Sequence, residues 1–302
     1  MSMDFIEGLK DRTVFIVGSK KNSGKTTFMN YAMSRLRGGA SMGALSVGVD
    51  GECRDLVFGN PKPQVRAERG DMLLCAETAL KSADLHCEIL NVYPFRTAIG
   101  RPVLLRALRP GRAEISGPEN NSQLAEVLTD MRRHGAGTVF VDGAVDRITQ
   151  VAAGGRAAFV YVAKVEPENL DSSAAAIKLV WAASSTPVWR EGGKCPGPVI
   201  RVPGALTPGK APPKEIKGGT LVIEDPTKIF LTWAQWQELK GRFELRFLAK
   251  PDLAAFVVNL FNVTRGDFER KLGVPELAER ITYNPYEPAG TLNAGERGKT
   301  NG

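Results

Sequence analysis

Apolar residues cluster in short runs that alternate with stretches of helical periodicity. Residues 14–17 form a continuous run, VFIV, rich in β-branched side chains, which is typical of a strand buried on both faces of a parallel sheet. Apolar side chains then recur at helical spacing at Phe28, Ala32, Met33 and Leu36, as expected for one face of a helix. The beginning of the chain therefore predicts a strand, a loop and a helix.

The same two patterns continue along the chain. Alternating strands and helices are typical of an α/β fold with a doubly wound, mostly parallel sheet. Ser122 is a suitable N-cap for the helix that begins at residue 123. Apolar runs predict further strands at residues 44–49, 138–141, 157–165, 220–224 and 254–259, and periodicity predicts helices at 123–135, 174–181 and 232–243.

Residues 54–118 depart from this alternation, because short extended segments there are separated by turns. Residues 65–77 read as two strands hinged at 69–71, and residues 102–117 as a hairpin that turns at 109–111. The domain organisation that we expect is a first part of the core at 1–53, a β-rich insertion at 54–118, the remainder of the core at 119–288 and a mobile tail at 289–302.

The segment between the first strand and its helix, GSKKNSGKTT, has the composition of a phosphate-binding loop. Gly24 lets the backbone approach an anion closely, and the first amides of the helix point unsatisfied donors at it. Lys25 is expected to reach the β- and γ-phosphates of a nucleoside triphosphate, and the Thr26 hydroxyl to bind Mg²⁺. The residues expected to contact the nucleotide here are Ser19, Lys21, Asn22, Ser23, Gly24, Lys25, Thr26 and Thr27.

The loop departs from the G-x-x-x-x-G-K-[ST] pattern, because Ser19 stands at the position of the first glycine. In this frame Lys20 resembles the signature lysine of the deviant phosphate loops found in cell-division and nitrogenase-type ATPases. That resemblance implies a P-loop NTPase fold and a nucleotide-sandwich dimer in which the lysine reaches across. Lys21 is the alternative, because K-N-S-G-K-T-T is also similar to the loop of molybdopterin-guanine-dinucleotide biosynthesis adapters, and the sequence does not choose between the two lysines.

Three carboxylates follow predicted strands and are candidates for the Mg²⁺ site. Asp142 ends an apolar strand, as a Walker-B aspartate does. Asp50 and Glu52 follow the strand at 44–49. Asp50 either holds the Mg²⁺ shell or orients the attacking water, with Glu52 assisting, or it forms a turn with Gly51. We expect Thr26, Asp50, Glu52 and Asp142 to bind the metal, and Lys20, Lys25, Asp50 and Asp142 to take part in catalysis.

Candidates for recognising the base lie near the end of the chain. Asn259 ends the strand at 254–259, and Asn284 precedes a proline in ITYNPYEP. Loops after late strands flank the base in this class of fold, although either asparagine also suits a simple turn. Asp146 and Arg147, just after Asp142, form either a switch segment that senses the γ-phosphate or a local ion pair.

Composition limits the remaining possibilities. The chain has 302 residues, a net charge of +7, four cysteines without C-x-x-C spacing and only two histidines, so neither a zinc site nor a Ser-His-Asp triad is expected. The arginines have no aromatic interleaving, so nucleic-acid binding is not expected. No apolar run approaches the roughly 20 residues needed to cross a bilayer, and the N-terminal segment lacks a signal-peptide core. A cytoplasmic protein without membrane contact is expected.

The order of motifs extends the resemblance along nearly the whole chain. GSKKNSGKTTFMN, SVGVDGE, NPKPQV, VDGAVDR, VPGALT and ITYNPYEP occur in this order and together resemble the small-subunit reactivase of cobalamin-dependent lysine and ornithine aminomutases. The resemblance implies that Lys25, Thr26 and Asp142 hold ATP or GTP with Mg²⁺, and that hydrolysis helps to reactivate a mutase. It also implies a homodimer, or a hetero-oligomer with a second ATPase subunit and the aminomutase.

Two other functions fit the same loop. One is an ATP-dependent synthetase resembling dethiobiotin synthetase, in which the substrate lies beside the γ-phosphate. The other is a nucleotide-binding adapter of molybdopterin-cofactor biosynthesis with little turnover. All three functions share the Mg²⁺-nucleotide site.

Overall fold

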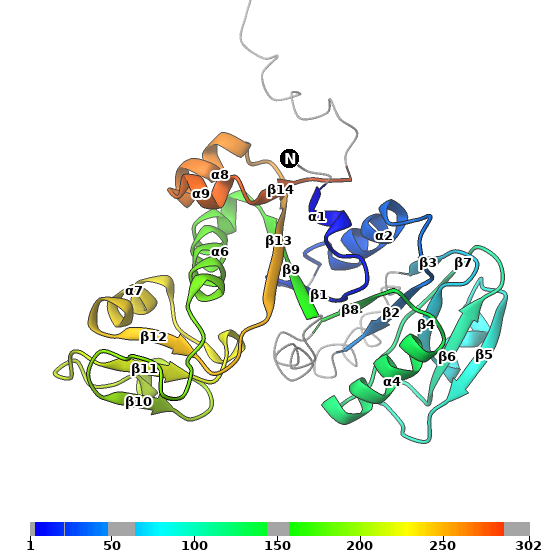
Figure 1. The fold of residues 1–302 in the computed structure, drawn as a ribbon. Helices are drawn as coiled ribbons and strands as arrows, with labels where there is room; N and C mark the ends of the chain where they lie inside the picture. The colour runs from blue at the N-terminus through cyan, green and yellow to red at the C-terminus, as the bar shows by residue number, and fades with distance from the viewer. Residues whose placement is uncertain (1–3, 21, 48–63, 144–156, 287–302) are drawn as a thin grey trace, which may run out of the picture.

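A nine-stranded sheet forms the centre of the fold (Figure 1). The computed structural model describes residues 4–20, 22–47, 64–143 and 157–286. The strands of this sheet are β1 (Thr13–Gly18), β2 (Met42–Ser46), β4 (Met72–Ala76), β5 (Cys87–Val92), β6 (Pro102–Ala107), β8 (Thr138–Asp142), β9 (Ala157–Val165), β13 (Asp252–Leu260) and β14 (Ile281–Tyr283).

The order of these strands is β14-β13-β9-β1-β8-β2-β4-β6-β5. Every neighbouring pair from β14 to β4 is parallel, whereas β6 is antiparallel to both β4 and β5. The expected α/β class with a mostly parallel sheet is confirmed. The α-helices are α1 (Asp4–Glu7), α2 (Lys25–Arg35), α4 (Asn121–Arg133), α6 (Leu170–Ser185), α7 (Trp233–Arg242), α8 (Arg265–Leu272) and α9 (Pro275–Ala278).

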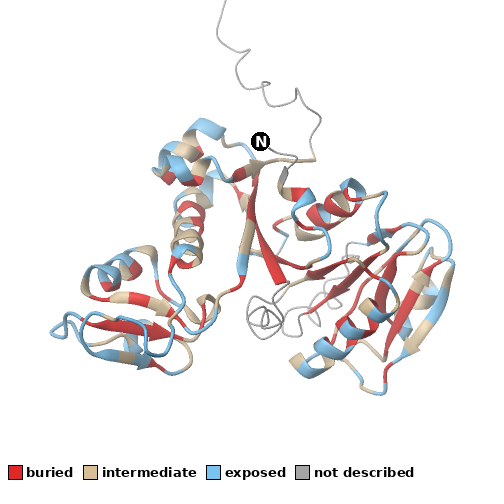
Figure 2. Ribbon diagram, in the orientation of Figure 1, coloured by how far each residue is buried: buried red, intermediate tan, exposed pale blue. Residues whose placement is uncertain are grey.

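Both faces of the sheet are covered, which explains why its strands read as continuous apolar runs. Phe15 and Val17 of β1 belong to one hydrophobic cluster, which also contains side chains of α4, α6 and α8. Val14 and Ile16 belong to a second cluster, together with the buried residues of α2. Figure 2 shows the central strands buried while the helices keep exposed outer faces. Burial on both faces is the usual environment of a parallel sheet.

The predicted strands and helices agree closely with the observed ones in the core. The run at 157–165 is β9, and the runs at 138–141 and 254–259 lie within β8 and β13. The strand predicted at 44–49 is β2, which begins earlier, at Met42, and ends at Ser46, while residues 48 and 49 lie outside the described residues. The N-cap of α4 is Asn120, whose side chain accepts from the Gln123 amide, so the prediction of Ser122 was wrong by two residues.

The two hairpin-like patterns within 54–118 have a different pairing from the one expected. β6 does not form a hairpin with β7 (Gly111–Ala113), because β6 pairs with β4 and β5 while β7 pairs with β3 (Val65–Ala67). Five of the six residues of β6 are buried, so this strand belongs inside a sheet rather than in a surface hairpin. β4 joins β2 and so extends the central sheet. The domain boundaries at 53 and 118 stay a prediction.

A buried aspartate holds the turn between β3 and β4. Asp71 is only 2% exposed. Its carboxylate accepts hydrogen bonds from the backbone amides of Met42 and Glu68, at 3.2 and 2.8 Å, and forms an ion pair with Arg37. A buried charge requires this degree of pairing. Asp71 therefore ties the predicted hinge at 69–71 to the beginning of β2.

A second, three-stranded parallel sheet lies beyond the C-terminal end of α6 (Figure 1). Its strands are β10 (Val199–Val202), β11 (Thr220–Ile223), which lies within the strand predicted at 220–224, and β12 (Glu244–Phe247), which was not predicted. Trp236 of α7 is fully buried against Phe247, with the two rings stacked at a centroid distance of 6.3 Å. Ala183 of α6 packs into the hydrophobic core that contains Trp236 and Phe247. Other side chains of α6 pack into the core of the central sheet, so this helix contributes to both cores. In the described parts of the chain, no helix has the length and apolarity that a membrane crossing demands.

We expect Asn120→Ala to lower the free energy of unfolding by about 1 kcal/mol, the usual cost of removing an N-cap. Ser122→Ala is the matched control, because its hydroxyl bonds to the Asn120 side chain and not to the backbone, and its effect should stay within about 0.5 kcal/mol. Urea denaturation followed by circular dichroism measures both values. Equal losses for the two variants would contradict the assignment of the cap.

Candidate functional site

The carboxyl end of β1 lies where the order of the sheet reverses. β8 and β9 follow one another among the described strands, yet they lie on opposite sides of β1. Phe15 pairs with Val141 of β8 on one side and with Phe159 of β9 on the other. In open α/β sheets, ligands bind outside the carboxyl ends of the strands at such a switch point. The candidate site therefore lies at the carboxyl edge around β1.

The β1–α2 loop lies at this edge, and its described residues are 19, 20 and 22–24. It is tied to β9 by the Ser19 amide, which donates to the Val162 carbonyl at 2.9 Å. Asn22 and Gly24 have left-handed backbone angles, with φ of 59° and 96°, and such turns produce concave arrays of N–H groups that bind anions. No side chain caps the start of α2, whereas α4, α7 and α8 are all capped by side chains. The first turn of α2 thus keeps its amides available for an anion.

Glycine is required at Gly24 for two separate reasons. Its φ of 96° is strained for any residue with a Cβ atom. A Cβ atom would also lie 2.7 Å from Nδ2 of Asn259 and 3.3 Å from the hydroxyl of Tyr286. The loop is therefore packed tightly against the end of β13 and the segment that follows β14.

Gly18, at the end of β1, is similarly crowded. A Cβ atom there would lie 2.4 Å from Oγ of Ser23 and 2.9 Å from Cδ of Lys25. The aliphatic part of Lys25 thus folds back over the end of β1. This arrangement places Lys25 beside the loop that precedes it. Its contact with the phosphates stays a prediction.

Thr26 and Asp142 come together across the site. The Thr26 hydroxyl donates to Oδ2 of Asp142 at 3.1 Å, although the two residues are 116 positions apart in the chain. Asp142 is the last residue of β8, and its register places it beside Ile16 of β1. A hydroxyl and a carboxylate oxygen at this distance are the types of ligand that Mg²⁺ takes.

Asn259 supports the loop from the end of β13. It is 2% exposed, and its Nδ2 donates to the Ser23 carbonyl at 2.9 Å. Within the described residues, three buried polar atoms around the loop have no hydrogen-bond partner, namely Oγ of Ser19, Oγ of Ser23 and Oδ1 of Asn259. Buried polar atoms are normally satisfied, so this cluster favours a polar ligand at the loop.

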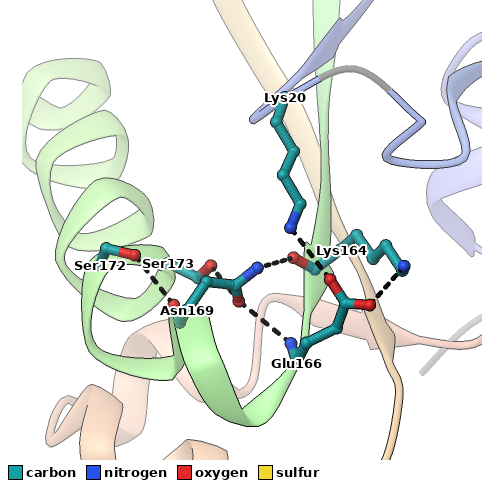
Figure 3. A network of polar contacts seen from close by, with 6 residues as sticks. All are labelled: Lys20, Lys164, Glu166, Asn169, Ser172 and Ser173. Atoms are coloured by element: carbon teal, nitrogen blue, oxygen red, sulfur yellow. Dashed lines mark hydrogen bonds and ion pairs between the residues drawn. The ribbon is translucent and has the colours of Figure 1, made fainter.

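Lys20 contacts a residue that the sequence analysis missed. Its ammonium group lies 3.1 Å from Oε2 of Glu166, which also pairs with Lys164 (Figure 3). Hydrogen bonds from Lys164 and Lys20 lower the pKa of Glu166 below its ordinary value. The available signal was an acidic residue directly after the predicted strand at 157–165, the same pattern that identified Asp142.

The structure describes three of the remaining predicted site residues, Asn284, Asn22 and Thr27. Asn284 has a φ of 38°, and its Oδ1 accepts from the Leu260 amide at 2.9 Å, so its side chain joins β14 to the end of β13. Asn22 is exposed within the loop, and Thr27 is exposed in the first turn of α2. Their contacts with a nucleotide stay predictions. Lys21, Asp50, Glu52, Asp146 and Arg147 lie outside the described residues.

A cavity of about 430 Å³ opens near the same edge. Its charged side chains are already paired with acids, because Arg270 contacts Asp267 at 3.0 Å and Lys271 contacts Asp171 at 2.6 Å. Its wall is formed by Pro167, Leu170, Asn262, Val263, Asp267, Arg270 and Lys271. Because these charges are already paired, the β1–α2 loop suits an anion better than this cavity does.

The described residues contain no group of three or more His, Cys, Asp or Glu side chains arranged to hold a metal.

We expect Gly24→Ala to lower the free energy of unfolding by roughly 1–3 kcal/mol, because it adds backbone strain and a contact with Asn259. Gly241→Ala is the matched control. Gly241 lies in α7, and a methyl group added there would meet nothing within 4 Å, so alanine should raise stability by about 0.5–1 kcal/mol. Thermal and urea unfolding measure both. A neutral Gly24→Ala would contradict the close packing of the loop.

Comparisons with known proteins leave the family open. No protein-family model, curated protein or solved structure matches the chain. The function must therefore be argued from the side chains and amides at the carboxyl edge.

Proposed function

We propose that the protein is a Mg²⁺-dependent P-loop nucleoside triphosphatase that binds the phosphates of its substrate at the β1–α2 loop. The contact between Thr26 and Asp142, at 3.1 Å, carries the proposal. It unites the two segments that the sequence pattern assigns to phosphate and metal binding, and it lies next to a helix start without a side-chain cap. Each feature is common alone, but their combination at the switch point of a parallel sheet favours this function.

Each residue of the site has a distinct role in this proposal. The first amides of α2 and the ammonium group of Lys25 bind the β- and γ-phosphate oxygens. Thr26 and Asp142 would hold Mg²⁺, which neutralises phosphate charge when it is bound. The buried hydroxyls of Ser19 and Ser23 gain acceptors on the phosphates. Asp50 would orient the attacking water, and Glu52 would bind the metal beside it.

Asn259 stays a proposed contact of the nucleotide. Its Nδ2 is committed to the Ser23 carbonyl, and its buried Oδ1 is an acceptor without a partner among the described residues. The substrate of the proposed reaction is ATP or GTP.

We expect Lys25→Ala to weaken ATP binding by about ten- to a hundredfold, because it removes a charged hydrogen-bond donor from the phosphates. Asp142→Ala should suppress Mg²⁺-dependent hydrolysis, with a smaller loss of ATP binding. Lys240→Ala is the matched control, because Lys240 is an exposed lysine in the last turn of α7. Isothermal titration calorimetry and phosphate release, each with and without EDTA, measure these effects. If wild-type protein bound none of ATP, ADP, GTP or GDP, the proposal would be wrong.

The order of the sequence motifs along the chain also favours a protein partner. In this view hydrolysis drives reactivation of a cobalamin-dependent aminomutase in the cytoplasm, within a dimer or with a second ATPase subunit. The second sheet and α7 lie away from the β1–α2 loop (Figure 1), which leaves them available for protein contacts. Phe230, at 62% exposed, is the most exposed large apolar side chain among the described residues and lies just before α7.

The partner proposal predicts an ATP-dependent complex. The purified chain should elute together with an aminomutase on size-exclusion chromatography in the presence of ATP, and separately from it without nucleotide. Phe230→Ser should weaken the complex without changing ATP binding. If the two proteins eluted separately under both conditions, the proposal of an aminomutase partner would be wrong, whereas the proposal of a nucleotide site would stand.

A further inference from the structure

Lys20 is the most exposed member of a three-residue charge cluster at the carboxyl edge. Its side chain is 43% exposed, compared with 30% for Glu166 and 27% for Lys164. It belongs to the β1–α2 loop, whereas the other two residues lie at the end of β9 and just after it. In Figure 3 the two lysines approach the Glu166 carboxylate from different elements. The cluster thus connects the loop to the neighbouring strand.

Glu166 and Lys164 are held in place without help from Lys20. The Glu166 amide donates to Oδ1 of Asn169 at 3.0 Å, and Asn169 Nδ2 donates to the Lys164 carbonyl at 3.3 Å. The Lys164 ammonium group lies 4.8 Å from the centroid of the Phe261 ring, a cation–π contact in addition to its ion pair. Oδ1 of Asn169 also accepts from Ser173 of α6. Departure of Lys20 would therefore leave Glu166 paired with Lys164 and fixed in position.

The contact between Lys20 and Glu166 is easily exchanged. Exposed ion pairs between long side chains contribute little, because solvent screens them and holding both side chains costs entropy. The phosphates of a nucleotide carry several negative charges, and the four-carbon stem of lysine lets its ammonium group move between nearby acceptors. Phosphate at the amides of α2 would compete with Glu166 for the same ammonium group.

We propose that Glu166 is a positioning residue that holds Lys20 beside the β1–α2 loop and releases it to the phosphates when a nucleotide binds. This inference rests on the proposed function. It gives Lys20 a defined position in the nucleotide-free protein, supplied by an acid from the end of β9. Breaking the contact with Glu166 therefore offsets part of the attraction between Lys20 and phosphate.

The test is Glu166→Gln, which keeps the size of the side chain and removes its charge. ATP affinity should rise about two- to fivefold, the range that corresponds to an exposed ion pair. Adenosine, which lacks phosphates, should show no gain. Asp171→Asn is the matched control, because it removes an equal charge nearby but its partner is Lys271 of α8. Glu166→Asp, which keeps the charge but shortens its reach, should show a smaller gain and serves if the glutamine variant does not fold.

A double-mutant cycle separates positioning from a general effect of charge. In a Lys20→Met background, Glu166→Gln should no longer raise ATP affinity beyond the Asp171→Asn control. A gain that persisted without Lys20, or equal gains for the Glu166 and Asp171 variants, would overturn the assignment of Glu166 and leave the nucleotide proposal intact. Failure of the wild-type protein to bind ATP would overturn both proposals.

Discussion

The parallel pairing of β1 with both β8 and β9 is the constraint on which the site depends. It brings the β1–α2 loop, Asp142 and Lys164 to one edge of the sheet, although long stretches of chain separate them. The hydrogen bond from Asn259 to the Ser23 carbonyl then fixes the loop against the end of β13. Gly24 permits this approach because it has no side chain. The geometry at the edge therefore follows from backbone pairing first and from side-chain contacts second.

Local pattern was sufficient to predict the elements that form this edge. Val14 to Val17 and residues 157–165 read as strands because burial on both faces makes them continuously apolar. The pairing of β6 was not predictable in the same way, because PVLLRA fits a hairpin or a central strand equally well and only its neighbours decide. β12, with just four residues of alternating burial, gives too short a signal.

The polar contacts, like the strands, were predictable from the sequence only in part. Asp142 and Asn259 were predicted because each ends a recognisable strand, and the structure brings both to the loop. Glu166 also follows a strand, but its importance comes from Lys20, which is 146 positions away in the chain. The cap of α4 was misplaced because Asn120, Asn121 and Ser122 are all suitable capping residues. A sequence identifies residues that are able to make a contact, whereas the fold selects the pair that does.

The double role of α6 has a mechanical consequence. Its first turn adjoins the Glu166 and Asn169 contacts, and its last turns pack into the core of the second sheet. A helix of 16 residues is about 24 Å long. A tilt of about 10° at its first turn would move its far end by about 4 Å, given that length. Any tilt of α6 would thus displace the second sheet, because the same helix packs into both hydrophobic cores.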